Sequence, residues 1–180
     1  MERKLSTVFA LDVVGFSKLM AEDEARTLDN LKKRREFIDT IIEEYEGRIF
    51  NTAGDSVLAE FASPVRAAEC AVQIQNRSQA MNIMSEDNDK MSFRVGINVG
   101  DVMISDENLF GDAVNIAARL EAQALIDGIC ISQSTFDMVN LKVKVSYEDA
   151  GELELKNIGR PIKAYNILKC KGATRNVTSS

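Results

Sequence analysis

The feature that most constrains the fold is an apolar run near the start of the chain that contains a single carboxylate. Residues 6–14 read STVFALDVV, and this mixture of β-branched and apolar side chains predicts a buried strand that ends at Gly15. Asp12 lies within that strand. A buried carboxylate without a partner is costly in free energy, so Asp12 needs one. A buried aspartate ordinarily caps the N-terminus of a helix or pairs with an arginine. The third possibility is that Asp12 belongs to a functional site.

The remaining pattern predicts one α/β domain with a mostly antiparallel sheet. Ser63 and Pro64 supply an N-cap and a first-turn proline for one helix, and Leu28 is expected on the core face of another. Gly100 and Asp101 are typical of a turn between two strands of a hairpin. The expected helices cover about 22–46, 64–83, 112–125 and 133–140, and the expected strands cover 6–14, 48–51, 56–61, 92–99, 102–105, 129–132, 143–154 and 161–168.

Composition argues against several classes of function. The chain has 180 residues, which fits one domain, and its 28 acidic and 22 basic residues leave a net charge of −6 with no basic run. Nucleic-acid binding and binding to an anionic membrane are therefore disfavoured. With no histidine and three widely spaced cysteines, Cys70, Cys130 and Cys170, a zinc site is not expected. The cysteines are expected to be buried free thiols, which are typical of a reducing cytosol. No apolar run is long enough to span a membrane, and together these features favour a cytoplasmic protein.

A second carboxylate can reach the end of the first strand. Asp55 follows a glycine in NTAGDSVLAEF, residues 51–61, at the expected tip of a hairpin. If this hairpin lies beside the strand that holds Asp12, the two carboxylates meet and repel by about 4 kcal/mol at ~4 Å. A divalent cation such as Mg²⁺ would cancel that repulsion, and Mg²⁺ prefers one or two carboxylates together with substrate phosphates. Gly15 would let backbone N–H groups approach such a phosphate.

Two polar residues share one face of a later helix. In GDAVNIAARLE, Asn115 and Arg119 are four residues apart, about opposite a core stripe of Ala113, Ile116, Ala117, Leu120 and Ala124. A solvated polar face is the simplest interpretation. The helix carries few charges, however, and a partner subunit that covers it would place both residues in an interface. Arginine there can clamp a phosphate through two donors.

Four stretches in order resemble the signature motifs of the class III nucleotidyl cyclase domain, the catalytic fold of adenylate and guanylate cyclases. They are FALDVVGFSKL at 9–19, NTAGDSVLAEF at 51–61, FRVGINVGDV at 93–102 and LFGDAVNIAARLE at 109–121. The resemblance implies a ferredoxin-like βαββαβ core with additional strands over residues 1–170, followed by a disordered tail, 171–180. It also implies a head-to-tail homodimer with two composite active sites.

The resemblance further implies a role for each matching residue in the conversion of ATP to cyclic AMP and pyrophosphate. Two divalent ions per site, Mg²⁺ or Mn²⁺, would be held by Asp12, Asp55 and the carbonyl of Val13. Backbone amides of residues 15–17 would hold the triphosphate, and these residues are Gly15, Phe16 and Ser17. Asn115 of the opposite subunit would orient the ribose. Arg119 of that subunit would offset charge on the α-phosphate.

The sequence departs from the family pattern where the base is recognised. Adenylate-specific members carry a Lys and an Asp at positions that are Asn51 and Asn108 here. Amides both donate and accept hydrogen bonds, so ATP is expected to be the better substrate, with weaker discrimination and GTP possible. Guanylate cyclases place a Glu at the first of these positions, and none is present. Lys156 is the nearest match to the family's phosphate-binding lysine.

Two alternatives remain at this point. The departures at Asn51 and Asn108 would also fit a catalytically weak or silent module that binds nucleotide and dimerises. A diguanylate cyclase on a related core is disfavoured, because its Gly-Gly-acidic-acidic hairpin is absent from the sequence. The regulatory partner or domain is not visible in these residues.

Overall fold

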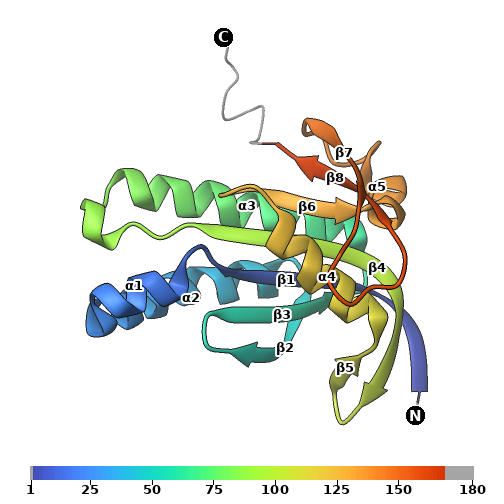
Figure 1. The fold of residues 1–180 in the computed structure, drawn as a ribbon, viewed down its shortest axis with the longest axis horizontal. Coiled ribbons are helices and arrows are strands. Elements are labelled where there is room, and N and C mark those ends of the chain that lie inside the picture. Colours follow the sequence, from blue (N-terminus) through green and yellow to red (C-terminus); the bar gives the residue numbers. More distant parts are fainter. Residues whose placement is uncertain (1, 169–180) are drawn as a thin grey trace.

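The computed structural model describes residues 2–168, which form one eight-stranded sheet with helices on both faces (Figure 1). The expected tail, 171–180, and Cys170 lie outside the described residues. The strands are β1 (Glu2–Val13), β2 (Gly47–Ala53), β3 (Ser56–Phe61), β4 (Phe93–Ser105), β5 (Asn108–Phe110), β6 (Ile129–Ser132), β7 (Tyr147–Leu153) and β8 (Ile162–Ile167). The helices are α1 (Phe16–Glu22), α2 (Glu24–Glu44), α3 (Pro64–Ile83), a short 3₁₀ turn η1 (Asp87–Asp89), α4 (Asp112–Gln123) and α5 (Gln133–Val139).

The sheet is mostly antiparallel, which confirms the expected fold class. Its strand order is β2-β3-β1-β4-β6-β8-β7, and β5 pairs with β4 beside this path. β4 and β6 are the parallel pair, and the other pairs of the described sheet are antiparallel. The expected edges of most helices and strands agree with the structure to within a few residues. β1 begins earlier than expected and β7 begins later.

Alternation along β1 divides the core between the two faces of the sheet. Phe9, Leu11 and Val13 pack in one cluster with residues of α2 and α3, whereas Val8 and Ala10 pack in another with residues of α4. Helices α2 and α3 therefore cover one face and α4 crosses the other (Figure 1). Asp12 has the same parity as Val8 and Ala10, so its side chain belongs to the α4 face.

The expected turn at Gly100 and Asp101 is wrong. β4 runs through both residues and stays paired with β1, from Ile104 opposite Glu2 to Phe93 opposite Val13. Gly100 serves close packing instead, because a Cβ added there would lie 3.0 Å from the Cβ of Ala113 in α4. The hairpin turn falls at Asp106 and Glu107, which both have positive φ, and it leads into β5.

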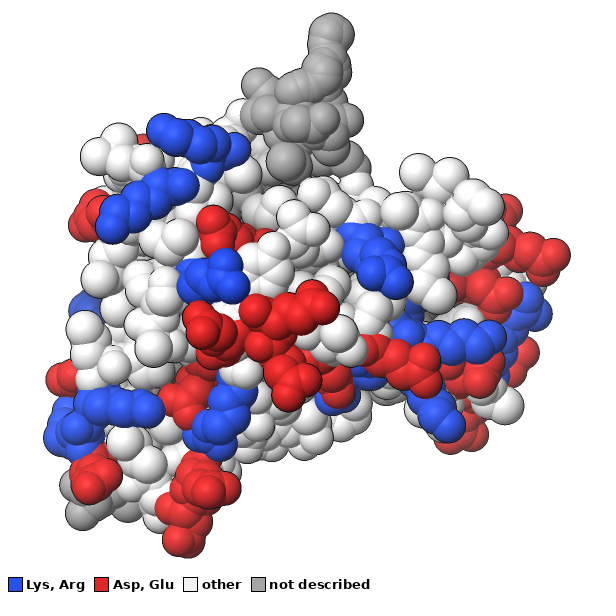
Figure 2. Space-filling view, turned by 180° about the vertical axis from the view of Figure 1, so that it is seen from behind, with Lys and Arg blue, Asp and Glu red and all other residues white. Residues whose placement is uncertain are grey.

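Charge is spread over the face of the sheet that α2 and α3 cover. Figure 2 views the molecule from this side, opposite to Figure 1, and shows acidic and basic side chains interspersed, with several acidic groups near the centre. Helix α2, which covers this face, carries local ion pairs of Lys33 with Asp29 and of Arg35 with Asp39. Across residues 2–168, no helix combines the length and the apolar character needed to cross a bilayer.

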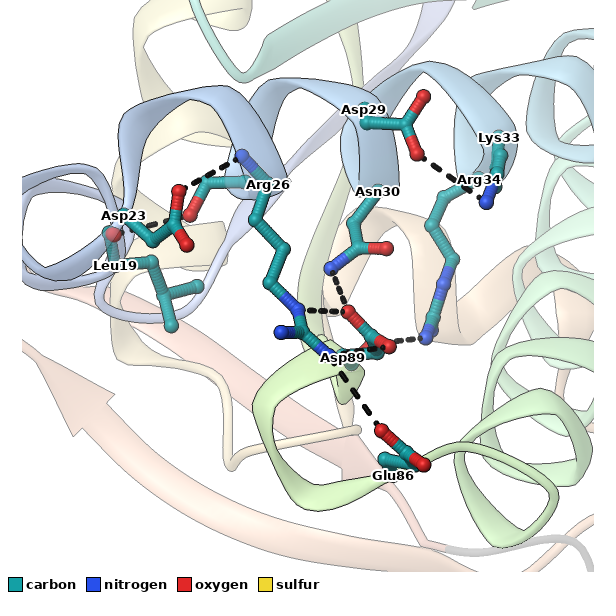
Figure 3. Close-up of polar contacts among 10 residues, drawn as sticks. Leu19, Asp23, Arg26, Asp29, Asn30, Lys33, Arg34, Glu86 and Asp89 are labelled. Atoms are coloured by element: carbon teal, nitrogen blue, oxygen red, sulfur yellow. Dashed lines mark hydrogen bonds and ion pairs between the residues drawn. The ribbon is translucent and has the colours of Figure 1, made fainter.

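Helix α2 is fixed by polar contacts as well as by its apolar face. Leu28 was expected in the core but is 46% exposed, whereas Asn30 and Arg34 are buried. Figure 3 shows Arg26 and Asn30 converging on the Asp89 carboxylate, while Arg34 donates to the backbone carbonyl oxygens of Asp89 and Met91. The first half of α2 therefore lies over the loop before β4, which explains why Leu28 faces outward.

Candidate active site

The tip of the β2–β3 hairpin lies at the end of β1. Gly54 occupies the turn with a φ of 61°, and β3 pairs with β1 so that Val57 lies opposite Leu11. This register carries Asp55 to the last residue of β1, where the Val13 backbone N–H donates a 3.0 Å hydrogen bond to Asp55 Oδ2. The expected neighbourhood of Asp12, Val13 and Asp55 is therefore present in the structure.

Asp12 is surrounded by charged groups from three elements. Arg94 lies opposite it on β4, Glu121 reaches it from α4, and Asp55 adds a second negative charge. Burial raises the pKa of Asp12 and the Asp55 charge adds to the rise, while the hydrogen bond with Glu121 and the charge of Arg94 oppose it. An arginine, one of the ordinary partners of a buried carboxylate, is thus combined here with two further acidic residues.

Glu121 is the site residue that sequence reasoning missed. The pKa of Glu121 is raised to about 9, chiefly by burial and in part by the neighbouring Asp12 carboxyl group. The available signal was spacing, since Glu121 continues the buried stripe of Ala113 and Ala117 at intervals of four residues.

The donor set fits a hard divalent cation. Asp12 and Asp55 provide carboxylate oxygens, and the end of β1 provides the backbone carbonyl of Val13. Repulsion from Asp55 raises the pKa of Asp12, and a cation between the two would remove that repulsion. Within the described residues, no group of three or more acidic or thiol side chains has the geometry of a metal site. Such a site would use phosphate and water for its remaining ligands, as Mg²⁺ sites do.

The turn after β1 has an uncapped helix start. Gly15 has a φ of 66°, and it is the N-cap of α1, where no side chain caps the first turn. A Cβ at Gly15 would meet no atom within 4 Å, so the left-handed backbone is what favours glycine there. The first amides of α1 belong to Phe16 and Ser17, which follow shortly after Val13, the residue whose N–H donates to Asp55.

Asn115 and Arg119 face away from the acidic group of the same chain. Asn115 is exposed, and Arg119 Nε donates a 3.1 Å hydrogen bond to the backbone carbonyl oxygen of Lys156, in the segment between β7 and β8. Residues two apart on a helix point to opposite sides, so Arg119 and Glu121 diverge. The structure brings the Arg119 side chain to the backbone of Lys156, on the side of α4 away from Glu121.

Asn51 and Asn108 lie on neighbouring segments. Arg48 Nη2 on β2 donates a 2.7 Å hydrogen bond to the carbonyl oxygen of Glu107, which joins β2 to the β4–β5 turn. Asn108 Oδ1 accepts a 3.0 Å hydrogen bond from the N–H of Leu109, which leaves its NH₂ group as the part able to reach a ligand. Asn51 is exposed on β2.

Known proteins have the same architecture and are similar in sequence. Residues 2–169 match the family model described as the adenylate and guanylate cyclase catalytic domain. The chain is 40% identical over 161 residues to "Putative adenylate cyclase 3" of Rhizobium meliloti (strain 1021), covering 89% of this chain and 27% of that protein. It thus spans about a quarter of the length of that relative.

Solved structures agree with this match. An adenylate/guanylate cyclase/hydrolase from Silicibacter pomeroyi superposes with a TM-score of 0.87 at 38% identity, over 93% of this chain and 98% of that one. The guanylate cyclase domain of RhGC from Catenaria anguillulae, in complex with GTP, has the same fold, with a TM-score of 0.78 at 24% identity over 95% and 100% of the two chains. Because the family model covers every residue that the structure describes, the chain belongs to the family of adenylate and guanylate cyclase catalytic domains.

Proposed function

We propose that this chain is the catalytic domain of an adenylate cyclase that converts ATP to 3′,5′-cyclic AMP and pyrophosphate at the interface of a homodimer. One observation carries the proposal. Asp12 and Asp55 lie together at the end of β1, whereas Arg119 points away from them toward Lys156. A complete site therefore needs the acidic half of one chain and the α4 face of a second copy.

The acidic half would hold the metal ions and the phosphates. Asp12, Asp55 and the Val13 carbonyl are the ligands for two Mg²⁺ or Mn²⁺ ions. When bound, these ions supply activation of the ribose 3′-hydroxyl and neutralise phosphate charge. Residues 15–17 (Gly15, Phe16, Ser17) offer uncapped backbone amides at the start of α1, and these amides bind the triphosphate oxygens.

The α4 half would act on the reacting centre. Arg119 donates to the α-phosphate as charge develops there, and Asn115 orients the ribose. Lys156 binds the other phosphates, and its backbone is already held by Arg119. The ribose 3′-hydroxyl gives up its proton to solvent and its oxygen forms a bond to the α-phosphorus, while the bond from that phosphorus to the oxygen shared with the β-phosphate breaks, so pyrophosphate leaves. Catalysis by these residues is positioning and electrostatic stabilisation.

Base selectivity in this proposal rests on two amides. Asn51 and Asn108 lie on adjacent segments, and the NH₂ group of Asn108 can donate to a purine acceptor. ATP is the proposed substrate because the Rhizobium relative carries the name of an adenylate cyclase. GTP remains a second substrate, since an amide donor also suits the guanine 6-oxo group. The buried free thiols of Cys70 and Cys130 fit a cytoplasmic domain.

The deciding experiment measures cyclic AMP and cyclic GMP formed from ATP and GTP, separately, with Mg²⁺ or Mn²⁺, over a range of protein concentrations. Cyclic AMP formation with specific activity that rises with concentration would support the dimeric adenylate cyclase. Equal rates with both nucleotides would support a cyclase of relaxed selectivity. A folded dimer that binds nucleotide but forms no cyclic product with either metal would identify a silent module instead.

A further inference from the structure

One hydrogen bond joins the two segments that carry the proposed base-reading amides. Arg48 Nη2 in β2 donates a 2.7 Å hydrogen bond to the carbonyl oxygen of Glu107 in the turn between β4 and β5. Asn108 is the next residue after Glu107, and Asn51 lies three residues after Arg48 on β2. A contact between residues 59 apart in sequence is therefore made close to both amides.

The residues beside the two amides belong to one apolar cluster. Asn51 lies opposite Leu58 in the pairing of β2 with β3, so these two side chains share a face of the sheet. Leu58 and Phe50 pack against the core cluster beneath α4, and Leu109, the residue after Asn108, is buried in that cluster. An apolar surface with a few polar groups at its border is the kind of site that binds a flat base.

Arg48 is itself held in place by an ion-pair network. Its Nε donates a 2.6 Å hydrogen bond to Glu60 on β3, and Lys4 Nζ on β1 lies 2.9 Å from the other oxygen of that carboxylate. Burial acts to raise the pKa of Glu60, but the hydrogen bonds from Lys4 and Arg48 outweigh it and hold the pKa below its ordinary value. The charged carboxylate therefore fixes the guanidinium group that reaches the carbonyl oxygen of Glu107.

The turn that Arg48 contacts has a strained backbone. Asp106 and Glu107 have φ values of 51° and 66°, a left-handed conformation that is unusual for two consecutive residues other than glycine. Hairpin turns of this kind ordinarily contain Asn-Gly. The pair of Arg48 with Glu60 would by itself join β2 to β3. The additional contact with the Glu107 carbonyl oxygen therefore points to a role in holding the turn.

We propose that Arg48 is a positioning residue for base recognition, because its hydrogen bond with the Glu107 carbonyl oxygen sets where Asn108 lies relative to Asn51. Arg48 does not itself contact the nucleotide. This inference deepens the proposed function and rests on it, since it assumes that the two amides bind the purine base. Loss of Arg48 should therefore weaken binding of the base and leave the metal-binding half-site in place.

Nucleotide binding without turnover tests the proposal. The probe is 3′-deoxy-ATP, which lacks the attacking hydroxyl and cannot be cyclised, and its dissociation constant is measured by calorimetry with Mg²⁺. R48A should raise this constant about three- to tenfold, the loss expected when one hydrogen bond no longer positions a binding group. In turnover assays with ATP, the fall in kcat/KM should come from KM. The matched control is R35A, which removes an ion pair with Asp39 within α2 and should leave binding of 3′-deoxy-ATP unchanged.

A double variant separates positioning from a general structural effect. If Arg48 acts through Asn108, R48A should weaken binding in the wild type but hardly at all in an N108A background, because the amide that it positions is already absent. Equal losses in the two backgrounds would overturn the proposal. A folded R48A protein that binds 3′-deoxy-ATP as tightly as the wild type would overturn it as well.

The single variant N108A distinguishes this inference from the proposed function. N108A should itself raise the dissociation constant of 3′-deoxy-ATP, since a base-reading amide is lost. Weak binding by N108A together with normal binding by R48A would overturn the role of Arg48 alone. Normal binding by N108A would overturn base reading by Asn108, on which that role depends. Formation of cyclic product is assayed separately and tests the catalytic part of the proposed function.

Discussion

The backbone N–H of Val13 donates a 3.0 Å hydrogen bond to the carboxylate of Asp55, and this bond joins the hairpin tip to the end of β1. The acidic half of the proposed site is therefore assembled by the pairing of strands within the sheet. Catalytic positioning benefits from such preorganisation, because the groups lose little freedom when substrate arrives. The α4 half is equally fixed, by the contact of Arg119 with the carbonyl oxygen of Lys156.

Replacing Asp55 by Asn tests the metal role without removing this structural bond. The amide oxygen of D55N can still accept from the Val13 N–H, so the free energy of unfolding should change by less than about 1 kcal/mol. Metal-dependent cyclic nucleotide formation should fall by at least about 100-fold, because a charged ligand is lost. Urea unfolding and turnover assays check the two parts. Near-normal turnover would remove Asp55 from the metal site.

Local signals in the sequence account for what could be predicted. The Ser63 hydroxyl oxygen accepts from the Arg66 N–H, and Pro64 opens α3, as their cap chemistry predicted. The meeting of Asp12 and Asp55 also followed from local elements, namely a strand and a hairpin tip that had only to be neighbours. Composition and periodicity were sufficient for the mostly antiparallel α/β fold.

Long-range contacts account for what could not be predicted. Gly100 and Asp101 are a residue pair typical of turns. Gly100 nevertheless lies within β4, where Ala113 of a helix later in the chain packs closely against it. Glu121 is an acidic residue in a buried stripe, and the Asp12 carboxyl group beside it lies more than half the chain away in sequence. Asp89 lies in a polar loop whose partners on α2 precede it by about 60 residues. No local pattern encodes these contacts.

Base selectivity should respond to restoring the family's charged pair. The double variant N51K/N108D should raise the preference for ATP over GTP by about tenfold or more, since a carboxylate accepts from the adenine amino group but not from the guanine 6-oxo group. Competition between the two nucleotides for cyclic product formation gives the ratio. The matched control is N51A/N108A, which should lower turnover without raising the preference. An unchanged ratio in the first variant would exclude base reading at these positions.

Gly96→Ala tests how tightly α4 is held against β4. The added Cβ would lie 2.3 Å from backbone atoms of Ala117 and Glu121, so the helix must shift. We expect a loss of about 1–3 kcal/mol in the free energy of unfolding, with a fall in turnover because α4 carries Arg119. The control Gly159→Ala adds a Cβ that meets no atom within 4 Å, and its effect on unfolding should stay within about 1 kcal/mol. Equal stability of the two variants, measured by urea unfolding, would contradict the packing argument.

Acid stability should depend on Asp89, which binds Arg26 and Asn30 of α2 (Figure 3). The hydrogen bond from Arg26 holds the pKa of Asp89 well below its ordinary value, and the hydrogen bond from Asn30 adds to the shift. A depressed carboxyl pKa stabilises the fold at pH values above the unfolded pKa, near 3.8, and this contribution disappears as pH falls through the folded pKa. D89N should therefore be less stable than the wild type at pH 7, and the difference should shrink below about pH 4.

Urea unfolding between pH 7 and pH 3 measures this difference in stability. D29N is the control, since Asp29 forms only an exposed pair with Lys33 on the same helix. A difference between D89N and the wild type that stays constant over this range would show that the charge of Asp89 does not stabilise α2.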